Sequence, residues 1–203
     1  MPYPFGDIAF TPAVKAAQEA NGSRAMYEKA AKSDRDFRLG PREAGFIAAR
    51  DHFYLATVSE TGWPYVQHRG GPPGFIQILD ERRFAFPDFR GNRQYVSVGN
   101  LSGEARASFF FMDYPNKARL KALAHVAIKS VEEEPEIIAR FAALSYDAAI
   151  ERVFIATIAA LDWNCPQHIT PRFSAEEMQP IIGPILEEVE ALRAEIERLK
   201  TGE

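Results

Sequence analysis

The chain has 203 residues, of which 46% are hydrophobic, so it is long enough to bury one sizeable core. Its 24 basic and 28 acidic residues give a formal net charge of -4, which provides no overall attraction to nucleic acid or to an anionic membrane. The only cysteine, Cys165, cannot form an intrachain disulfide, and the four histidines lack the spacing of zinc ligands. These features favour one domain over residues 1–203, without a structural metal.

Targeting and membrane signals are not visible in the sequence. No stretch approaches the roughly 20 apolar residues that span a bilayer, and the start, MPYPFGDIAF, lacks a basic region followed by an apolar one. A single cysteine also agrees with a reducing compartment. We therefore expect a cytoplasmic protein with neither a membrane nor a nucleic-acid partner.

The first part of the chain has helical composition. Residues 11–32 are rich in Ala, Lys and Glu, with Thr11 as N-cap and an interruption at Gly22, which predicts two short helices. Another helical stretch covers residues 41–51. Together these segments predict a helical N-terminal extension over residues 1–51.

From His52 onward, aromatic and β-branched segments alternate with turn residues, which predicts successive antiparallel strands. In one long segment small and apolar residues such as Leu120 and Val126 alternate with polar ones such as Lys121 and His125, which is typical of a half-buried strand. The spacing of the segments is that of a Greek-key β-barrel, closed or split, over residues 52–172. The predicted strands are 53–59, 64–69, 74–79, 83–87, 95–101, 104–112, 118–131 and 151–162.

Two further helices are predicted around the last strand. The segment EEEPEIIARFAAL carries acidic residues ahead of an apolar stripe, which indicates a covering helix. A final helix spans residues 174–201, with Ser174 and Glu177 as a capping box. Its apolar residues recur at alternating spacings of four and three, so it either pairs with another helix or lies on its own barrel. The fold class is thus mainly β with added helices, a Greek-key split barrel with N-terminal, covering and C-terminal helices.

The first group of candidate binding residues lies where a predicted strand runs into the glycine-rich connection at residues 70–74. Arg69 offers several planar donors, and Gln67 and His68 offer further hydrogen bonds, which suits a polar planar ligand that carries phosphate. Glycines there allow backbone to approach a ligand closely. A hairpin whose polar side chains simply face water explains the same pattern.

The second group follows the strand that ends at Pro87 and Asp88. Arginine, amide and glycine residues are concentrated there, including Asn92, Arg93 and Gln94. Charge-assisted and backbone N–H bonds from such a turn can hold a phosphate dianion. The alternative is a solvated turn whose arginines form weak surface ion pairs.

The third group follows the last predicted strand. There Trp163 could stack on an aromatic ligand, and Asn164, Gln167 and His168 could address its hydrogen-bonding edge. We do not assign Cys165 as a nucleophile, because nothing in its surroundings in the sequence indicates a lowered thiol pKa and lone cysteines are usually buried. No residue is assigned as catalytic.

The three groups, in this order on a Greek-key barrel, resemble the FMN-binding split-barrel superfamily typified by pyridoxamine 5'-phosphate oxidase. The similarity spans residues 42–172. It implies that the strand of Gln67, His68 and Arg69 lies along the flavin and that the following turn cradles its phosphate. The cofactor-binding residues that it implies are Gln67, His68, Arg69, Pro87, Asp88, Asn92, Arg93, Gln94, Asn100, Asn164, Gln167 and His168.

The sequence departs from the true oxidases at two places. Gln94 replaces a lysine of the phosphate cradle, which removes one positive charge and gives Arg69 more of the task. The late Arg-x-His substrate motif is missing, since Arg172 is followed by Phe173 and Ser174. Oxidation of pyridoxamine phosphate is therefore disfavoured.

The resemblance implies FMN as cofactor and a homodimer with FMN at the subunit interface. It also implies a flavin-dependent oxidoreductase that uses a small-molecule electron donor and acceptor, with an unknown substrate. The alternative is a non-catalytic protein that binds flavin, deazaflavin or haem. In the haem case His68, His125 or His168 would be the axial ligand.

Overall fold

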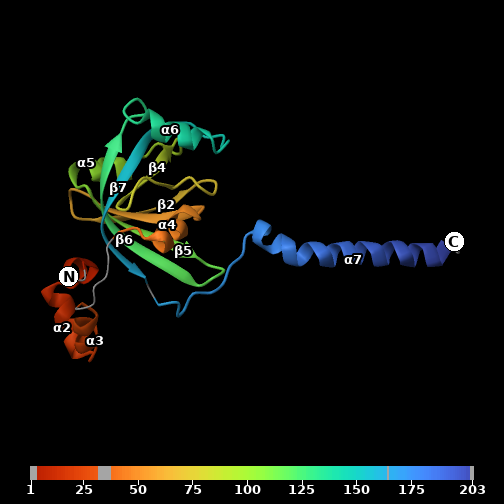
Figure 1. Cartoon of the computed structure of the whole chain (residues 1–203), viewed down its shortest axis with the longest axis horizontal. Coiled ribbons are helices and arrows are strands. Elements are labelled where there is room, and N and C mark those ends of the chain that lie inside the picture. Colours follow the sequence, from red (N-terminus) through yellow and green to blue (C-terminus); the bar gives the residue numbers. More distant parts are fainter. Residues whose placement is uncertain (1–3, 32–37, 164, 202–203) are drawn as a thin grey trace. The chain divides into compact units, whose positions relative to one another are not determined.

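The computed structural model describes residues 4–31, 38–163 and 165–201. The chain divides into two compact units, residues 1–113 with 119–165 and residues 114–118 with 166–203. The first unit contains the β-sheet and the helices that cover it, and the second contains the long helix α7 (Ala175–Thr201) (Figure 1).

Within the described residues the strands form one seven-stranded antiparallel sheet, curled into a split β-barrel as the sequence predicts. Their order across the sheet is β2-β1-β5-β6-β7-β4-β3, so β2 and β3 are its two edges. Strand β7 is the longest and pairs with β6 on one side and β4 on the other. The strands are β1 (His52–Val58), β2 (Pro64–Gly70), β3 (Gln77–Ile78), β4 (Arg83–Phe89), β5 (Arg106–Asp113), β6 (Ala118–Lys129) and β7 (Ile150–Trp163).

Alternation of side chains explains which face of each strand is buried. In β1 every second residue, beginning with Phe53, points into the barrel, and Leu120 and Val126 of β6 are buried as predicted. The barrel interior is filled mainly by phenylalanine rings in edge-to-face and stacked arrangements, such as Phe53 and Phe86 with ring centroids 4.9 Å apart. The fully buried phenylalanines of this core are Phe53, Phe75, Phe84, Phe86, Phe109, Phe111 and Phe154.

The predicted strand at 95–101 is wrong, because this segment forms helix α5 (Val96–Gly103). Its buried residues, Ser97, Asn100 and Leu101, are spaced three and four apart, which places them on one face of a helix. The predicted strand 74–79 shrinks to β3, because Gly74 adopts a positive φ of 87° and the backbone N–H of Phe75 closes a turn onto a carbonyl three residues earlier. Tertiary burial overrides the local β-preference in the first case, and turn geometry shortens the strand in the second.

Most predicted helices are confirmed. Helices α2 (Pro12–Ala20) and α3 (Arg24–Ala31) follow the first prediction, with the Thr11 hydroxyl accepting the N–H of Val14 at the start of α2. Helix α4 (Pro41–Ala48) follows the second. Helix α1 (Pro4–Ala9) was not predicted, and it contacts β7.

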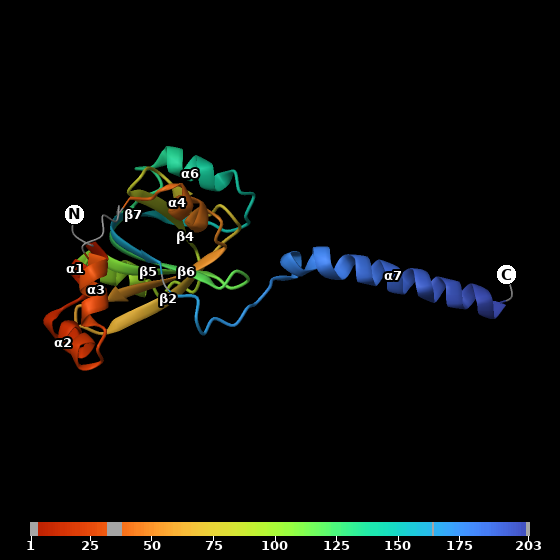
Figure 2. The same cartoon turned by 60° about the horizontal axis from the view of Figure 1, so that its bottom comes forward.

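The covering helix α6 (Pro135–Ala142) is also confirmed. It buries Ile137 and Phe141 against Ala85, Val153 and Ile155, which point outward from β4 and β7. Helices α1 to α3 lie toward the opposite end of the barrel from α6 (Figures 1 and 2).

Helix α7 begins with the predicted capping box. The Ser174 N–H donates to Glu177 Oε2 at 2.8 Å, and the Glu177 N–H donates to Ser174 Oγ at 3.1 Å. Among the described residues, no helix combines the length and the apolar character that crossing a bilayer requires.

Candidate anion site at the split of the barrel

The candidate site lies where the two ends of the sheet approach each other. Arg69 on the edge strand β2 forms an ion pair with Asp88 on β4, although four strands lie between β2 and β4 in the sheet order. Nearby, the Ser97 hydroxyl of α5 donates to Gln67 Oε1 of β2 at 2.7 Å. These two links fix β2, β4 and the start of α5 around a common space.

That space is a cavity of about 200 Å³, formed by the ends of β2, β4 and β7 and by the loop before α5. It brings together several of the sequence-predicted residues, including Arg69, Asn92 and Arg93. Gln67 and Arg69 both reach the cavity because every second residue of β2 points to the same face. The full lining is Gln67, Arg69, Asp88, Phe89, Gly91, Asn92, Arg93, Tyr95, Val98 and Glu151.

Asp88 is the buried acid at the floor of the site. Its side chain is 7% exposed and accepts hydrogen bonds from Arg69 and, at 2.9 Å, from Arg152. Arg152 reaches it because Asp88 and Arg152 are directly opposite each other in the β4–β7 pairing. Arg69 is itself 12% exposed, and its Nε is buried without a hydrogen-bond partner. A buried guanidinium N–H without an acceptor is costly unless a ligand supplies one.

Glu151 is the second acid of the site. Its carboxylate accepts from Arg90 Nε at 3.0 Å, from the Tyr95 hydroxyl at 3.2 Å and from Arg152 at 3.3 Å. The hydrogen bond from Arg90 is the main cause that lowers the pKa of Glu151, and Tyr95 and Arg152 act in the same direction. The pKa of Arg93 is raised, mainly by its interaction with Tyr95, to which it is hydrogen-bonded, and to a smaller extent by the charge of Glu151.

The charges around the cavity do not cancel. Four cations belong to this network, because Arg69 and Arg93 line the cavity and Arg90 and Arg152 pair with its acids. Only two carboxylates, Asp88 and Glu151, oppose them among the described residues of the network. The difference is two positive charges, which matches the charge of one phosphate dianion.

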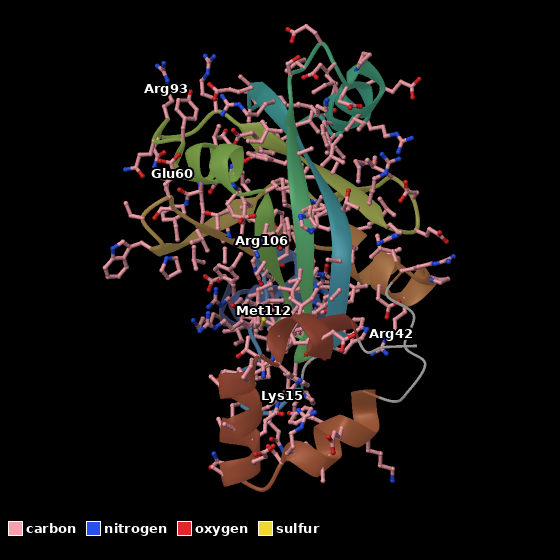
Figure 3. All side chains as sticks on the ribbon, turned by 90° about the vertical axis from the view of Figure 1, so that its left-hand side faces the viewer. Lys15, Arg42, Glu60, Arg93, Arg106 and Met112 are labelled. Atoms are coloured by element: carbon pink, nitrogen blue, oxygen red, sulfur yellow. The ribbon has the colours of Figure 1, made fainter. Side chains whose placement is uncertain are left out.

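The loop before α5 adds backbone groups to the site. Arg93 and Tyr95 both have left-handed backbone conformations, with φ of 61° and 55°, and the N–H of Gln94 donates to Asn92 Oδ1 at 3.1 Å. Such conformations are costly for residues other than glycine and concentrate at functional sites. After these two residues the N-terminus of α5 lies beside the cavity, which Val98 lines. Backbone N–H groups at a helix N-terminus favour an anion. Arg93 lines the cavity, and Figure 3 shows its side chain at the outer edge of the molecule, pointing away from the barrel.

Other predicted binding residues of the barrel do not line this cavity. His68 points to the opposite face of β2 from Arg69 and stacks on His52, with ring centroids 5.5 Å apart. Pro87 alternates with Asp88 in β4 and is buried, and the exposed Gln94 contributes its backbone to the loop turn. Asn100 is buried and donates to Thr57 Oγ1 at 3.0 Å, a bond that ties α5 to β1.

The segment after β7 passes from the first unit into the second. Trp163 is held within the first unit, because its indole N–H donates to Glu43 at 2.7 Å and the Arg42 guanidinium lies 4.1 Å from the ring centroid. Cys165 is exposed, contrary to the usual burial of lone cysteines. Gln167 and His168 are exposed in the second unit, where His168 has a φ of 62°. Asn164 lies outside the described residues, so the roles of this segment stay predictions.

The glycine-rich connection after β2 has a packing role. A Cβ on Gly71 would lie 2.7 Å from Cγ of Phe75, whose side chain is 1% exposed. The need for glycine at position 71 is therefore explained by the close approach of the Phe75 ring, and not by a ligand.

Sequence reasoning gave no role to three residues of the network, Tyr95, Glu151 and Arg152. The sequence pattern predicts that Tyr95 begins a strand, but Tyr95 precedes α5 as its N-cap. Glu151 and Arg152 begin β7, and a charged pair at the start of an otherwise apolar strand was the available signal. Their meeting with Asp88 depends on the pairing of β4 with β7, which only the fold reveals.

A family model described as pyridoxamine 5'-phosphate oxidase matches residues 39–161, which is more than half of the chain and includes the whole cavity lining. The chain belongs to this family. No curated protein sequence matches it significantly. Within the described residues, no cluster of histidine, cysteine and acidic residues is suited to a metal ion.

Solved structures of similar fold come from several bacteria. HupZ from Group A Streptococcus has 12% identity and a TM-score of 0.48, over 66% of this chain and 100% of that one. An FMN-binding protein from Syntrophomonas wolfei has 14% identity and a TM-score of 0.44, over 75% and 95%. A protein related to general stress protein 26, from Clostridium acetobutylicum, has 15% identity and a TM-score of 0.45, over 68% and 94%.

Proposed function

We propose that this member of the pyridoxamine 5'-phosphate oxidase family binds FMN by its phosphate at the split of the barrel and acts as a flavin-dependent oxidoreductase. The observation that carries the proposal is the buried Arg69 guanidinium, whose Nε has no partner, in a cavity whose two acids also pair with Arg90 and Arg152, so that the network as a whole carries two excess positive charges. A phosphate monoester supplies both the missing acceptor and the two negative charges.

The size of the cavity agrees with a site for one end of the cofactor. Its volume of about 200 Å³ is below the range of roughly 300–1,000 Å³ that is typical for whole ligands. The cavity therefore suits the phosphate and the adjoining sugar chain. The ring system would extend along β2, an edge strand whose outer backbone groups are not paired within the sheet.

Each residue around the phosphate has a distinct task in this proposal. Arg69 donates from the cavity floor, and Asp88 fixes its orientation by the ion pair. Asn92 and the backbone N–H groups at the start of α5 complete the donors, while Arg93 adds charge at the rim. Gln67 remains oriented by the Ser97 hydroxyl, which donates to its side-chain oxygen and leaves its amide N–H groups for the ligand.

The bound isoalloxazine supplies the chemistry, since it accepts and returns a hydride. The protein contributes position and environment, and none of its described side chains needs to act as a nucleophile. We further propose a homodimer with the cofactor at the subunit interface, with His68, Gln167 and His168 as groups near the ring. A small-molecule donor and acceptor complete the reaction, and pyridoxamine phosphate is not the proposed substrate.

The test begins with the absorption spectrum of the purified protein and mass analysis of any released chromophore. Added FMN is then titrated against the apoprotein by quenching of flavin fluorescence, with riboflavin as the matched ligand that lacks phosphate. We expect FMN to bind much more tightly than riboflavin. Equal affinity for the two ligands would refute the phosphate site, and a haem or deazaflavin chromophore would replace FMN as the cofactor.

A further inference from the structure

The helix α7 carries a seam that the proposed cofactor site does not use. Its apolar residues follow a heptad repeat in which the a positions are β-branched and two of the d positions are leucine. This combination favours a parallel two-stranded coiled coil. The a positions are Ile182, Val189 and Ile196, and the d positions are Met178, Ile185, Leu192 and Leu199.

Most of the apolar residues of this seam are exposed to solvent. Ile185 is 55% exposed, Leu192 57%, Ile196 51% and Leu199 69%. The flanking Ile181 and Leu186, at positions g and e, are also more than half exposed and would meet in a parallel pair. Pro180 and Pro184 fall at positions f and c, outside the seam, and the stretch from Ile185 to Thr201 contains no proline.

The charges beside the seam select both the partner and its orientation. In a parallel pair, residue g of one helix faces residue e of the next heptad in the other. Glu188 would then face the partner's Arg193, and Glu195 would face the partner's Lys200. In an antiparallel pair g faces g and e faces e, so glutamate would face glutamate and cation would face cation.

The intrachain contacts leave the first of these pairs available. Neither Glu188 nor Arg193 forms an ion pair with another described residue, while Glu195 also bonds Arg198 of its own helix at 2.8 Å. We infer that α7 pairs with α7 of a second copy of this chain as a parallel coiled coil. Because the two helices run in the same direction, the barrels of both copies are connected to the same end of the coil.

The test is disulfide cross-linking in the full-length chain with Cys165→Ser as background. Leu192→Cys places a thiol at a d position, which faces its counterpart only in a parallel pair, and Ala194→Cys places it at the outward f position as the matched control. Under mild oxidation at micromolar concentration, we expect the Leu192→Cys chain to cross-link at least tenfold faster. Equal rates would overturn the proposal. They are expected if α7 lies on its own barrel or if dimers are joined only through the barrels.

Reversing the charges at positions g and e tests whether the two helices are parallel. Glu188→Lys with Glu195→Lys in the Leu192→Cys chain sets like charges in all four charged g–e contacts, and we expect cross-linking to slow roughly tenfold. Adding Arg193→Glu and Lys200→Glu to the same chain restores opposite charges and should restore the rate. Failure of the fourfold reversal to recover would refute the parallel arrangement, and FMN titration of the same variants reports separately on the cofactor site.

Discussion

Removal of the Arg69 guanidinium is the most direct probe of the anion site. Arg69→Gln keeps a polar side chain of similar length but removes the charge and the buried Nε that has no partner. A hydrogen bond to a charged group contributes about 1.5–3 kcal/mol, and about 1.4 kcal/mol corresponds to a tenfold change in affinity. We therefore expect FMN to bind roughly 10- to 150-fold more weakly, while riboflavin affinity stays unchanged.

The stability of this variant can be estimated from the same contacts. Asp88 loses one of its two cationic partners but retains Arg152 at 2.9 Å. The free energy of unfolding should therefore fall by about 1–3 kcal/mol, less than the roughly 3–5 kcal/mol that follows when a buried charge is left alone. Urea unfolding of the apoprotein measures this term separately from the fluorescence titration.

The matched control is Arg83→Gln, at the start of β4, the strand that ends beside the cavity. Arg83 is 52% exposed and pairs with Asp80 at 2.7 Å, so its loss should change stability by at most about 1 kcal/mol. FMN affinity should stay within about twofold of the unmodified protein, because Arg83 does not line the cavity. If a folded Arg69→Gln protein bound FMN as tightly as the control, the phosphate assignment would be incorrect.

The other residues of the site differ in what their removal should change. Arg93→Ala should weaken FMN binding less than Arg69→Gln in the same titration, because Arg93 points away from the barrel at the rim. Asn100→Ala should lower the free energy of unfolding by about 1–3 kcal/mol in urea without removing a phosphate contact, because buried Thr57 loses its hydrogen-bond partner. Glu151→Gln should destabilise the apoprotein at pH 7, where the carboxylate is ionised. This loss of stability should shrink as pH falls below 4.5, the pKa of the carboxyl in the unfolded chain, and should vanish once pH is also below its lowered pKa in the folded protein. Urea curves at pH 7 and pH 3 measure this effect, and an unchanged difference at pH 3 would show that the ionised carboxylate is not its cause.

Much of the barrel could be predicted because its strands carry their burial pattern locally. Alternation in the segments that became β1 and β6, with turn residues between them, is a property of a few neighbouring residues. The helix α5 could not be predicted in this way. Its sequence YVSVGNL has β-branched residues that favour a strand, and only packing of Leu101 in the core and the Asn100 bond to Thr57 select the helix.

The candidate site was predictable in part for a similar reason. Gln67, Arg69, Asn92 and Arg93 could be identified by residue type and order along the chain, and the fold brings them into one cavity. Arg152 could not be identified, because its importance comes from standing opposite Asp88 in the β4–β7 pairing. Long-range register decides which charges meet, and a single sequence does not display it.

The helix α5 also determines what kind of ligand the cavity can take. As a strand, the segment after Gln94 would present side chains alternately to two faces and would spend its backbone N–H groups on sheet pairing. As a helix, it leaves its first N–H groups without intrahelical partners, and these begin directly after the left-handed Arg93 and Tyr95. The strained loop thus places a helix N-terminus beside the cavity that the buried Arg69 lines, and the two together favour an anion over a neutral polar ligand.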